Sequence, residues 1–518
     1  MDTSMMKVEE ACPGEDLTLS AGSFRISSEI IMDILRFLCP TDIISMRKTC
    51  RMMHRITKCR VVWLEALERV CDKYGIFKPT FPMEEMSILE LEHASTGPTR
   101  FLDGVKRYQP EESVRPYLTR TPQLRRERSS YDSFVYDAFQ LVPGGRFLFT
   151  SAIDTVCLFD LGYNMNVPVK PSPLAVLDNF GELRAIAPTR NRKKLLVATL
   201  KWSLPGTPLS RILYIHQINP NRRGQGLKFH CKGSLELHRP QDATLMGDMH
   251  LTSTFVFFKR TQEFILWDWA RNRGCRWPAT TVHYTQFYVF KDTLLAGGLN
   301  DHTYHYDLPA ATSIVTDPAQ PDHLDDLESL THQPKASLSP PDGEHNHIVL
   351  CGLSVWCENS PLDPQVCLIY PNEGSSYLQL YTLKPLNVPE CPFLPRSLPV
   401  PGGHTTKFYG DDHASSSLYQ SLPSLFRCED KLVICTSSDQ GGLLMSILPV
   451  PSKATLEEIM PTTVVLVPSG SLMEEIEPNQ FAFCPMSGRA VYFESSGMSD
   501  DVQIVDYLLP PEEPLQEP

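Results

Sequence analysis

The sequence predicts a multidomain chain, with an all-α N-terminal region followed by a large all-β domain. The first observation is a helical periodicity between residue 24 and about residue 105, where apolar residues share one face of each segment. The second is a change of texture near residue 131, after which short β-rich runs alternate with turn residues up to residue 509. No long helical pattern interrupts these runs, so the sequence predicts β-structure throughout residues 131–509.

The composition predicts a folded protein inside the cell. The 518 residues suffice for two or three domains, and 42% apolar with 21% charged residues is an ordinary balance. A net charge of −13 without a clear basic patch argues against nucleic acid or an anionic membrane as a partner. The acidic N-terminus and the lack of an apolar run of about 18 residues argue against a targeting peptide or a membrane span. We therefore expect a cytoplasmic and/or nuclear protein.

The sequence predicts no catalytic residue, no metal site and no cofactor. Its 15 cysteines form neither a paired Cys-x-x-Cys motif nor a His/Cys block of the kind that binds zinc. His302 and His305 lie close to Asp307, but residues three apart on a strand point to opposite faces and cannot converge on one ion. Phosphate-binding loops and nucleophile motifs are also missing.

Residues 24–63 are the part of the sequence with the most specific pattern. A first helix is indicated by apolar residues at helical offsets and ends at Cys39-Pro40, because the residue before a proline avoids the α region. A second helical run follows, and Trp63 closes the segment. Five motifs stand here in order, namely Glu29-Ile30, Ile34-Leu35-Arg36-Phe37-Leu38, Pro40-Thr41-Asp42-Ile43, Cys50-Arg51 and Trp63.

This order and spacing resemble the F-box. Ile26-Ser27 stands where the F-box pattern has Leu-Pro, so an apolar anchor is kept while the proline of the first helical turn is lost. A segment of about 40 residues cannot bury enough apolar surface to be stable alone, and this one carries more apolar side chains than a small hairpin hides. The surplus therefore needs a partner.

The resemblance implies that this partner is the adaptor of an SCF-type ubiquitin ligase, and through it a cullin. The implied adaptor-binding residues are Ile26, Ile30, Ile34, Leu35, Leu38, Pro40, Ile43, Ile44, Met46, Cys50 and Trp63, the last of which packs the final helix. The alternative is that these side chains are ordinary core residues of a helical domain.

The predicted domain order follows from these patterns. Residues 1–23 read as a disordered N-terminus, 24–64 as the F-box, 65–108 as a helical linker, 109–130 as an extended connector, 131–509 as the β domain and 510–518 as a disordered tail. A basic recognition strip is the alternative for the connector. Two segments of the β domain read as insertions, one acidic and Pro-rich at residues 317–345 and one at 386–424.

The β-rich runs repeat. Residues 142–162 resemble the second half of a WD repeat, with two strands joined by a turn and Phe159-Asp160 where the repeat usually has Trp-Asp. Trp267-Asp268 itself ends another unit. Seven units end near residues 160, 217, 268, 307, 382, 449 and 507, which predicts a propeller of about seven blades, with six or eight as alternatives.

Together these features predict the substrate-recognition subunit of an SCF-type ubiquitin ligase, in which the F-box binds the adaptor and the β domain binds a protein client. The arrangement resembles F-box proteins common in fungi. The alternatives are a propeller scaffold that acts outside degradation and, less in keeping with the missing catalytic motifs, a propeller enzyme. Nothing in the sequence identifies the client or the propeller face that binds it.

Overall fold

The chain divides into two compact units, which we describe separately. The helical unit comprises residues 26–70 and 83–96, and the propeller unit comprises residues 71–82 and 97–509. The computed structural model describes residues 26–109, 112–122, 124, 138–152, 155–202, 210–221, 227–238, 249–260, 263–279, 284–298, 302–309, 323–338, 349–352, 355–357, 360, 365–372, 375–385, 397–408, 424–437, 442–449, 462–467, 481–493 and 502–509.

The helical unit is built from short helices. Ser27 caps α1 by accepting a hydrogen bond from the backbone of Ile30 at 3.4 Å, and Pro40 occupies the first turn of α2, where a missing N–H costs nothing. The helices are α1 (Ser28–Leu35), α2 (Pro40–Arg47), α3 (Arg51–Ile56), α4 (Arg60–Lys73) and α5 (Ile88–Val105). Both α4 and α5 begin in this unit and end in the propeller unit. The predicted linker, residues 65–108, is therefore shared by the two units.

The strands of the propeller unit form seven sheets. Sheet 1 has β2 (Ala138–Leu141), β3 (Phe147–Ala152), β4 (Thr155–Asp160) and β5 (Ala175–Asp178); sheet 2 has β6 (Glu182–Pro188), β7 (Leu195–Trp202), β8 (Ser210–Ile218) and β9 (His230–His238). Sheet 3 has β10 (Met249–Leu251), β11 (Val256–Arg260), β12 (Glu263–Asp268), β13 (Arg273–Pro278) and, added parallel to β13, β17 (Glu328–Ser329). Sheet 4 has β14 (Tyr284–Phe290), β15 (Thr293–Gly298), β16 (Thr303–Asp307) and β18 (Ala336–Leu338).

The last three sheets continue the pattern of antiparallel neighbours. Sheet 5 has β19 (Val349–Gly352), β20 (Gln365–Asn372), β21 (Ser375–Pro385) and β22 (Ser397–Phe408); sheet 6 has β23 (Ser424–Cys428), β24 (Lys431–Ser437), β25 (Leu443–Pro449) and β26 (Thr462–Val467). Sheet 7 has β27 (Phe481–Cys484), β28 (Arg489–Phe493) and β29 (Val502–Asp506), and its fourth strand is β1 (Leu118–Arg120). The chain segment that precedes sheet 1 thus completes sheet 7.

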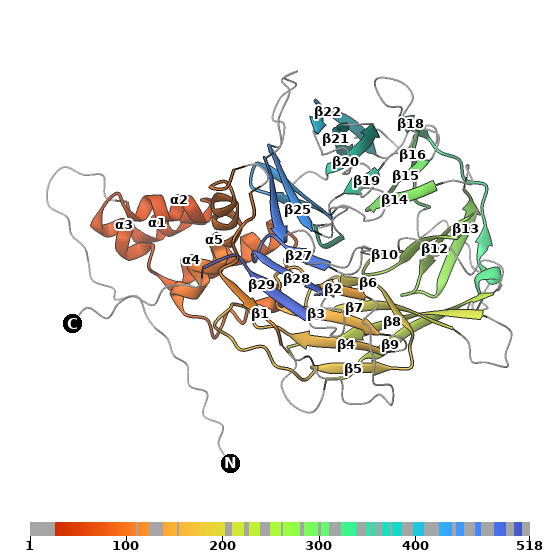
Figure 1. The fold of residues 1–518 in the computed structure, drawn as a ribbon, viewed down its shortest axis with the longest axis horizontal. Coiled ribbons are helices and arrows are strands. Elements are labelled where there is room, and N and C mark those ends of the chain that lie inside the picture. Colours follow the sequence, from red (N-terminus) through yellow and green to blue (C-terminus); the bar gives the residue numbers. More distant parts are fainter. Residues whose placement is uncertain are drawn as a thin grey trace, which may run out of the picture. The chain divides into compact units, whose positions relative to one another are not determined.

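The sheets follow one another around a ring, which makes this region a β-propeller (Figure 1). Apolar clusters join sheet 1 to sheet 2, sheet 2 to sheet 3, sheet 3 to sheet 4, sheet 4 to sheet 5 and sheet 7 to sheet 1. Strand β19 contacts β23, and the ring of Phe426 on β23 lies 6.3 Å from that of Phe483 on β27. Because a four-stranded sheet cannot bury both faces alone, each sheet depends on its neighbours.

The predicted ends of the repeat units lie at or near the end of the third strand of each sheet. The predicted ends at 160, 268, 307 and 449 are the last residues of β4, β12, β16 and β25, and the other three lie within three residues of such an end. The aspartates found at these ends pair with cations: Asp160 with Arg146 at 2.9 Å, Asp268 with Arg271 at 2.8 Å, Asp307 with Lys335 at 2.8 Å, and Asp506 with Arg489 at 2.6 Å. The Trp-Asp-like ending of the repeat therefore marks an ion pair that holds the end of the strand.

Two predicted insertions turn out to contain strands of the sheets. Within residues 317–345, β18 is the fourth strand of sheet 4, while Leu324 and Leu327 are buried in the apolar cluster between sheets 2 and 3. Within residues 386–424, β22 is the fourth strand of sheet 5. The interpretation of both segments as insertions was wrong for these residues, because outer strands tolerate the prolines and charges that suggested loops. The rest of both segments lies outside the described residues.

The end of α4 is also fixed by local geometry. Gly75 follows this helix, and its φ of +66° is the left-handed conformation that glycine adopts without strain. A side chain at Gly75 would place its Cβ 2.6 Å from the carbonyl carbon of Trp356. The helix therefore stops where the backbone of the propeller unit approaches it closely. The later part of the predicted helical linker forms one helix, α5, with Pro98 inside it.

Candidate functional site

Helix α1 and the turn after it expose a row of apolar side chains. Ile30 and Ile34, four residues apart, lie along one side of α1, while Ile26 precedes its N-cap and Phe37 follows its C-cap. Phe37 is 88% exposed and Ile30 is 54% exposed. Single exposed apolar residues are common on proteins, but four large ones on and directly beside one short helix indicate a surface that binds a partner. We call these four residues the α1 stripe.

The opposite side of α1 carries the core of the helical unit. Ile31 and Leu35 are each 1% exposed, and Ile43 of α2 is fully buried. Arg69 of α4 donates to the carbonyl oxygens of Leu35 at 3.5 Å and Leu38 at 3.0 Å, and the Leu35 carbonyl also accepts from the Leu38 backbone at 3.2 Å. Burial lowers the pKa of the Arg69 guanidinium from its ordinary value, yet arginine stays charged at neutral pH. The α1 stripe is thus held on a helix whose other face and end are fixed.

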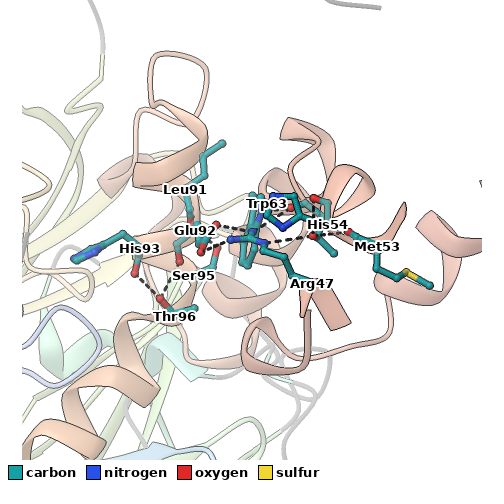
Figure 2. A network of polar contacts seen from close by, with 10 residues as sticks. Arg47, Met53, His54, Trp63, Leu91, Glu92, His93, Ser95 and Thr96 are labelled. Carbon is teal, nitrogen blue, oxygen red and sulfur yellow. Dashed lines mark hydrogen bonds and ion pairs between the residues drawn. The ribbon is translucent and has the colours of Figure 1, made fainter. Parts of the chain in front are cut away.

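A polar network joins α2, α3, α4 and the first half of α5 (Figure 2). Arg47 donates through two nitrogens to the carboxylate of Glu92, at 3.0 and 2.7 Å, and also to the hydroxyl and carbonyl of Thr57. The indole N–H of Trp63 donates to the same Thr57 carbonyl at 2.7 Å, and the Arg47 guanidinium lies 5.4 Å from the Trp63 ring centre. Bidentate arginine–carboxylate pairs fix orientation as well as distance, so this network sets how the helices lie within the unit.

The structure places the predicted adaptor-binding residues in three environments. Exposed are Ile26, Ile30, Ile34 and Cys50; half-buried are Leu38, Pro40, Ile44 and Met46; buried inside the helical unit are Leu35, Ile43 and Trp63. The first two sets are available to a partner, whereas the buried set contributes through packing. Trp63 is buried, and its indole contacts Thr57 and Arg47.

Phe37 was not among the predicted binding residues, although it is the most exposed large apolar side chain described in the chain. The signal for it was present, since Phe37 continues the spacing of Ile30 and Ile34 by three residues. What the sequence did not indicate is which of two adjacent apolar rows on α1 faces inward. The row with Ile31 and Leu35 does so.

Comparison with known proteins identifies this region. Residues 24–65 match the family model of the F-box domain. The chain therefore carries an F-box domain in its helical unit, followed by a β-propeller. F-box domains bind the adaptor of SCF ubiquitin ligases and, through it, a cullin.

The propeller gives no comparable identification. Its similarity to solved structures is low: a hydrazine synthase of Kuenenia stuttgartiensis (10% identity, 74% of this chain and 99% of that chain, TM-score 0.38), the computationally designed Ika8 protein (11%, 77% and 100%, 0.36) and a chain of the Mitotic Checkpoint Complex (10%, 76% and 93%, 0.38). Scores this low carry no information on the function of this chain. The comparison with curated proteins gave no match.

Two searches of the described residues gave negative results. No helix among them combines the length and apolar character needed to cross a bilayer. No group of three or more histidine, cysteine, aspartate or glutamate side chains in this part of the chain is arranged to hold a metal ion.

His305 is fully buried, and burial lowers its pKa to about 4, so it is neutral at physiological pH.

Proposed function

We propose that this protein is the substrate-recognition subunit of an SCF-type ubiquitin ligase. The observation that carries the proposal is the α1 stripe, because it lies within the matched F-box domain and presents apolar surface that the helical unit does not bury. An adaptor that covers Ile26, Ile30, Ile34 and Phe37 removes this surface from water. Removing that surface from water is the main favourable contribution to most protein–protein association.

The propeller is the candidate client receptor. We take each of its seven sheets to be one blade, since each supplies at least four strands and contacts the sheets on either side. Propellers present many loops on a rigid frame, and loops held in this way commonly carry binding residues. The client is a protein, and the complex acts in the cytoplasm or nucleus.

The mechanism needs no catalytic residue in this chain. Binding a client next to the ubiquitin-charged enzyme holds a client lysine close to the reactive thioester and raises its effective concentration. The reaction itself then takes place on other subunits. The chain's contribution is to bind two partners at once.

The adaptor half of the proposal is tested by capture from cells. We would purify the full chain under proteasome inhibition and compare it with an Ile30→Asp, Ile34→Asp double variant. Burying two carboxylates in an apolar interface costs at least several kcal/mol, enough to abolish capture of the adaptor and cullin. Val176→Asp is the matched control, because it places an acid at an exposed apolar position of the propeller unit.

The outcomes separate the receptor from the propeller scaffold. Loss of adaptor and cullin, with another protein retained and accumulating, supports the receptor and identifies the client. Failure of the unmodified chain to capture the adaptor refutes the receptor and favours a propeller scaffold that acts outside degradation. A client whose abundance is the same with and without the F-box leads to the same conclusion.

A further inference from the structure

The helical unit contains a run of basic residues that no acid interrupts. Residues 43–64 include six lysines and arginines and no aspartate or glutamate, although the whole chain carries a net charge of −13. Two of the six bind groups within the unit. Arg47 pairs with Glu92 at 2.7 Å, and Arg60 donates to backbone carbonyl oxygens, including that of Met83 at 2.6 Å. The remaining four cations are available at the surface.

These four cations are exposed on and beside α3. Lys48 caps the end of α2, and Lys58 follows the residue that caps the end of α3. Arg51 and Arg55 lie one turn apart on α3, where like charges destabilise a helix. In the described part of the chain no carboxylate pairs with any of the four. We define the α3 basic surface by these residues, Lys48, Arg51, Arg55 and Lys58.

The α3 basic surface and the α1 stripe lie on neighbouring helices of one unit. Helix α3 contacts both α1 and α2. With six residues, α3 is only about 9 Å long. A basic surface and an apolar surface are therefore close together. A single segment that carries both acidic and apolar side chains can bind both of them.

The N-terminal segment of the chain has this composition. Residues 8–24 contain no lysine or arginine and four acids, namely Glu9, Glu10, Glu15 and Asp16. Between these acids and Ile26 stand three large apolar residues, Leu17, Leu19 and Phe24. The segment lies outside the described residues and leads directly into Ile26, which belongs to the α1 stripe. Its acids equal in number the cations of the α3 basic surface.

The segment is long enough to reach α3. Ten residues separate Asp16 from Ile26, and ten residues of chain span up to about 33 Å, several times the length of α3. Because a short chain tethers the acids to the unit, their effective concentration near α3 is in the millimolar range. Exposed ion pairs are weak individually, but at this concentration several weak pairs suffice for binding.

We propose that residues 8–24 bind the helical unit of their own chain, with the acids on the α3 basic surface and the apolar residues on the α1 stripe. The bound segment covers the surface that the adaptor binds, so the segment and the adaptor compete. Binding of the segment does not depend on the proposed function, whereas the competition rests on it. The segment keeps the α1 stripe out of water until the adaptor displaces it.

The first test is cross-linking of the full chain with a carbodiimide, which joins a carboxylate to a lysine amine only when the two are in contact. Residues 8–24 should link to Lys48 and Lys58, and not to Lys193 or Lys232, which are exposed on the propeller unit. An Arg51→Glu, Arg55→Glu variant should give about tenfold fewer links, because two attractions become repulsions. Lys170→Glu, Lys228→Glu is the matched control, with the same charge change at exposed positions of the propeller unit.

Three results of the cross-linking would overturn the proposal. One is an even spread of links over the exposed lysines of both units, and another is an equal yield in the two charge-reversed variants. The third is found by mixing isotope-labelled with unlabelled chain: linked peptides that combine the two at the random frequency would show that the segment binds a second copy. Should the Arg51→Glu, Arg55→Glu variant lose its circular dichroism spectrum, Glu9→Gln, Glu10→Gln repeats the comparison, since links from Glu15 and Asp16 should then fall.

The second test measures the affinity of the adaptor for the full chain. Deleting residues 2–22 should raise this affinity about tenfold, which corresponds to a segment that is bound for about nine-tenths of the time. Neutralising the four acids with Gln and Asn should have the same effect, and an unchanged affinity in both variants would overturn the competition. If no form of the chain binds the adaptor, the proposed function fails. The cross-links, which are measured without adaptor, still decide whether the segment binds.

Discussion

The closure of the propeller depends on one buried aspartate, and its removal should be costly. Asp506 at the end of β29 is 3% exposed and pairs with two arginines. Arg489 donates to one carboxylate oxygen and Arg120 of β1 donates to the other, both at 2.6 Å. Arg489 also donates to the carbonyl oxygens of Gly145 at 2.6 Å and Gly162 at 2.8 Å. The carboxylate thus joins β1, β28 and β29.

The change Asp506→Ala removes the acceptor from the buried Arg489 and from the half-buried Arg120. Each hydrogen bond to a charged group contributes about 1.5–3 kcal/mol. Arg489 keeps its two carbonyl acceptors, whereas Arg120 keeps one distant carbonyl, that of Val167 at 3.4 Å. We therefore expect a loss of about 3–5 kcal/mol, the range found when one partner of a buried ion pair is deleted.

Hydrogen exchange with mass spectrometry shows in which strands the Asp506→Ala variant loses stability. Peptides covering β1 and β29 should lose protection in Asp506→Ala before the rest of the propeller does. Asp103→Ala is the control, since Asp103 pairs with Lys106 on the surface, with side chains 58% and 47% exposed, and such pairs contribute at most about 1 kcal/mol. A change in Asp506→Ala no larger than in Asp103→Ala would refute the conclusion that this carboxylate holds the ring closed.

Three further predictions concern other parts of the chain. Leu35→Asp should unfold the helical unit, with a loss of more than about 4 kcal/mol, while Ile34→Asp should leave its thermal midpoint unchanged and abolish adaptor capture; equal midpoints would contradict the assigned burial. Glu92→Ala should cost about 1–3 kcal/mol by freeing Arg47, seen as faster exchange in α2, and unchanged exchange would argue against the network. Burial lowers the pKa of His216 to about 4 from 6.5, so between these pH values the unfolded chain binds a proton that the folded chain does not. The free energy of unfolding should therefore fall by about 3 kcal/mol as the pH falls from 6.5 to 4. In urea titrations at a series of pH values, the His216→Phe variant should lack this contribution of His216 to the fall.

Much of the architecture follows from short sequence patterns, for reasons that particular residues show. The ends of the repeats could be predicted because Asp160, Asp268 and Asp307 each pair with a nearby cation at the end of a strand. The F-box was recognisable because its motifs depend on local constraints, such as Pro40 opening α2 and Trp63 following at a fixed distance. Both kinds of signal lie within a few tens of residues.

The parts that could not be predicted depend on contacts between distant segments. The fourth strands of sheets 4 and 5 lie at outer edges, where Pro399 and Pro401 in β22 are tolerated and the alternating pattern is lost. Strand β1 was expected to be part of an extended connector, because nothing in three residues indicates a partner near residue 504. On α1, Ile30 and Ile31 are equally apolar, and only the packing of the helical unit decides that Ile31 is buried.

The pairing of β1 with β29 also sets the order in which the protein can fold as it is synthesised. Arg120 and Asp506, which meet in sheet 7, are separated by 386 residues along the chain, whereas the Arg47–Glu92 contact of the helical unit spans 45. Contacts between distant residues form slowly, and β1 has no partner until β29 has left the ribosome. The α1 stripe is thus complete long before the ring can close. Under the function proposed above, a nascent chain stalled within the propeller would already display the α1 stripe and would occupy an adaptor without being able to present a client.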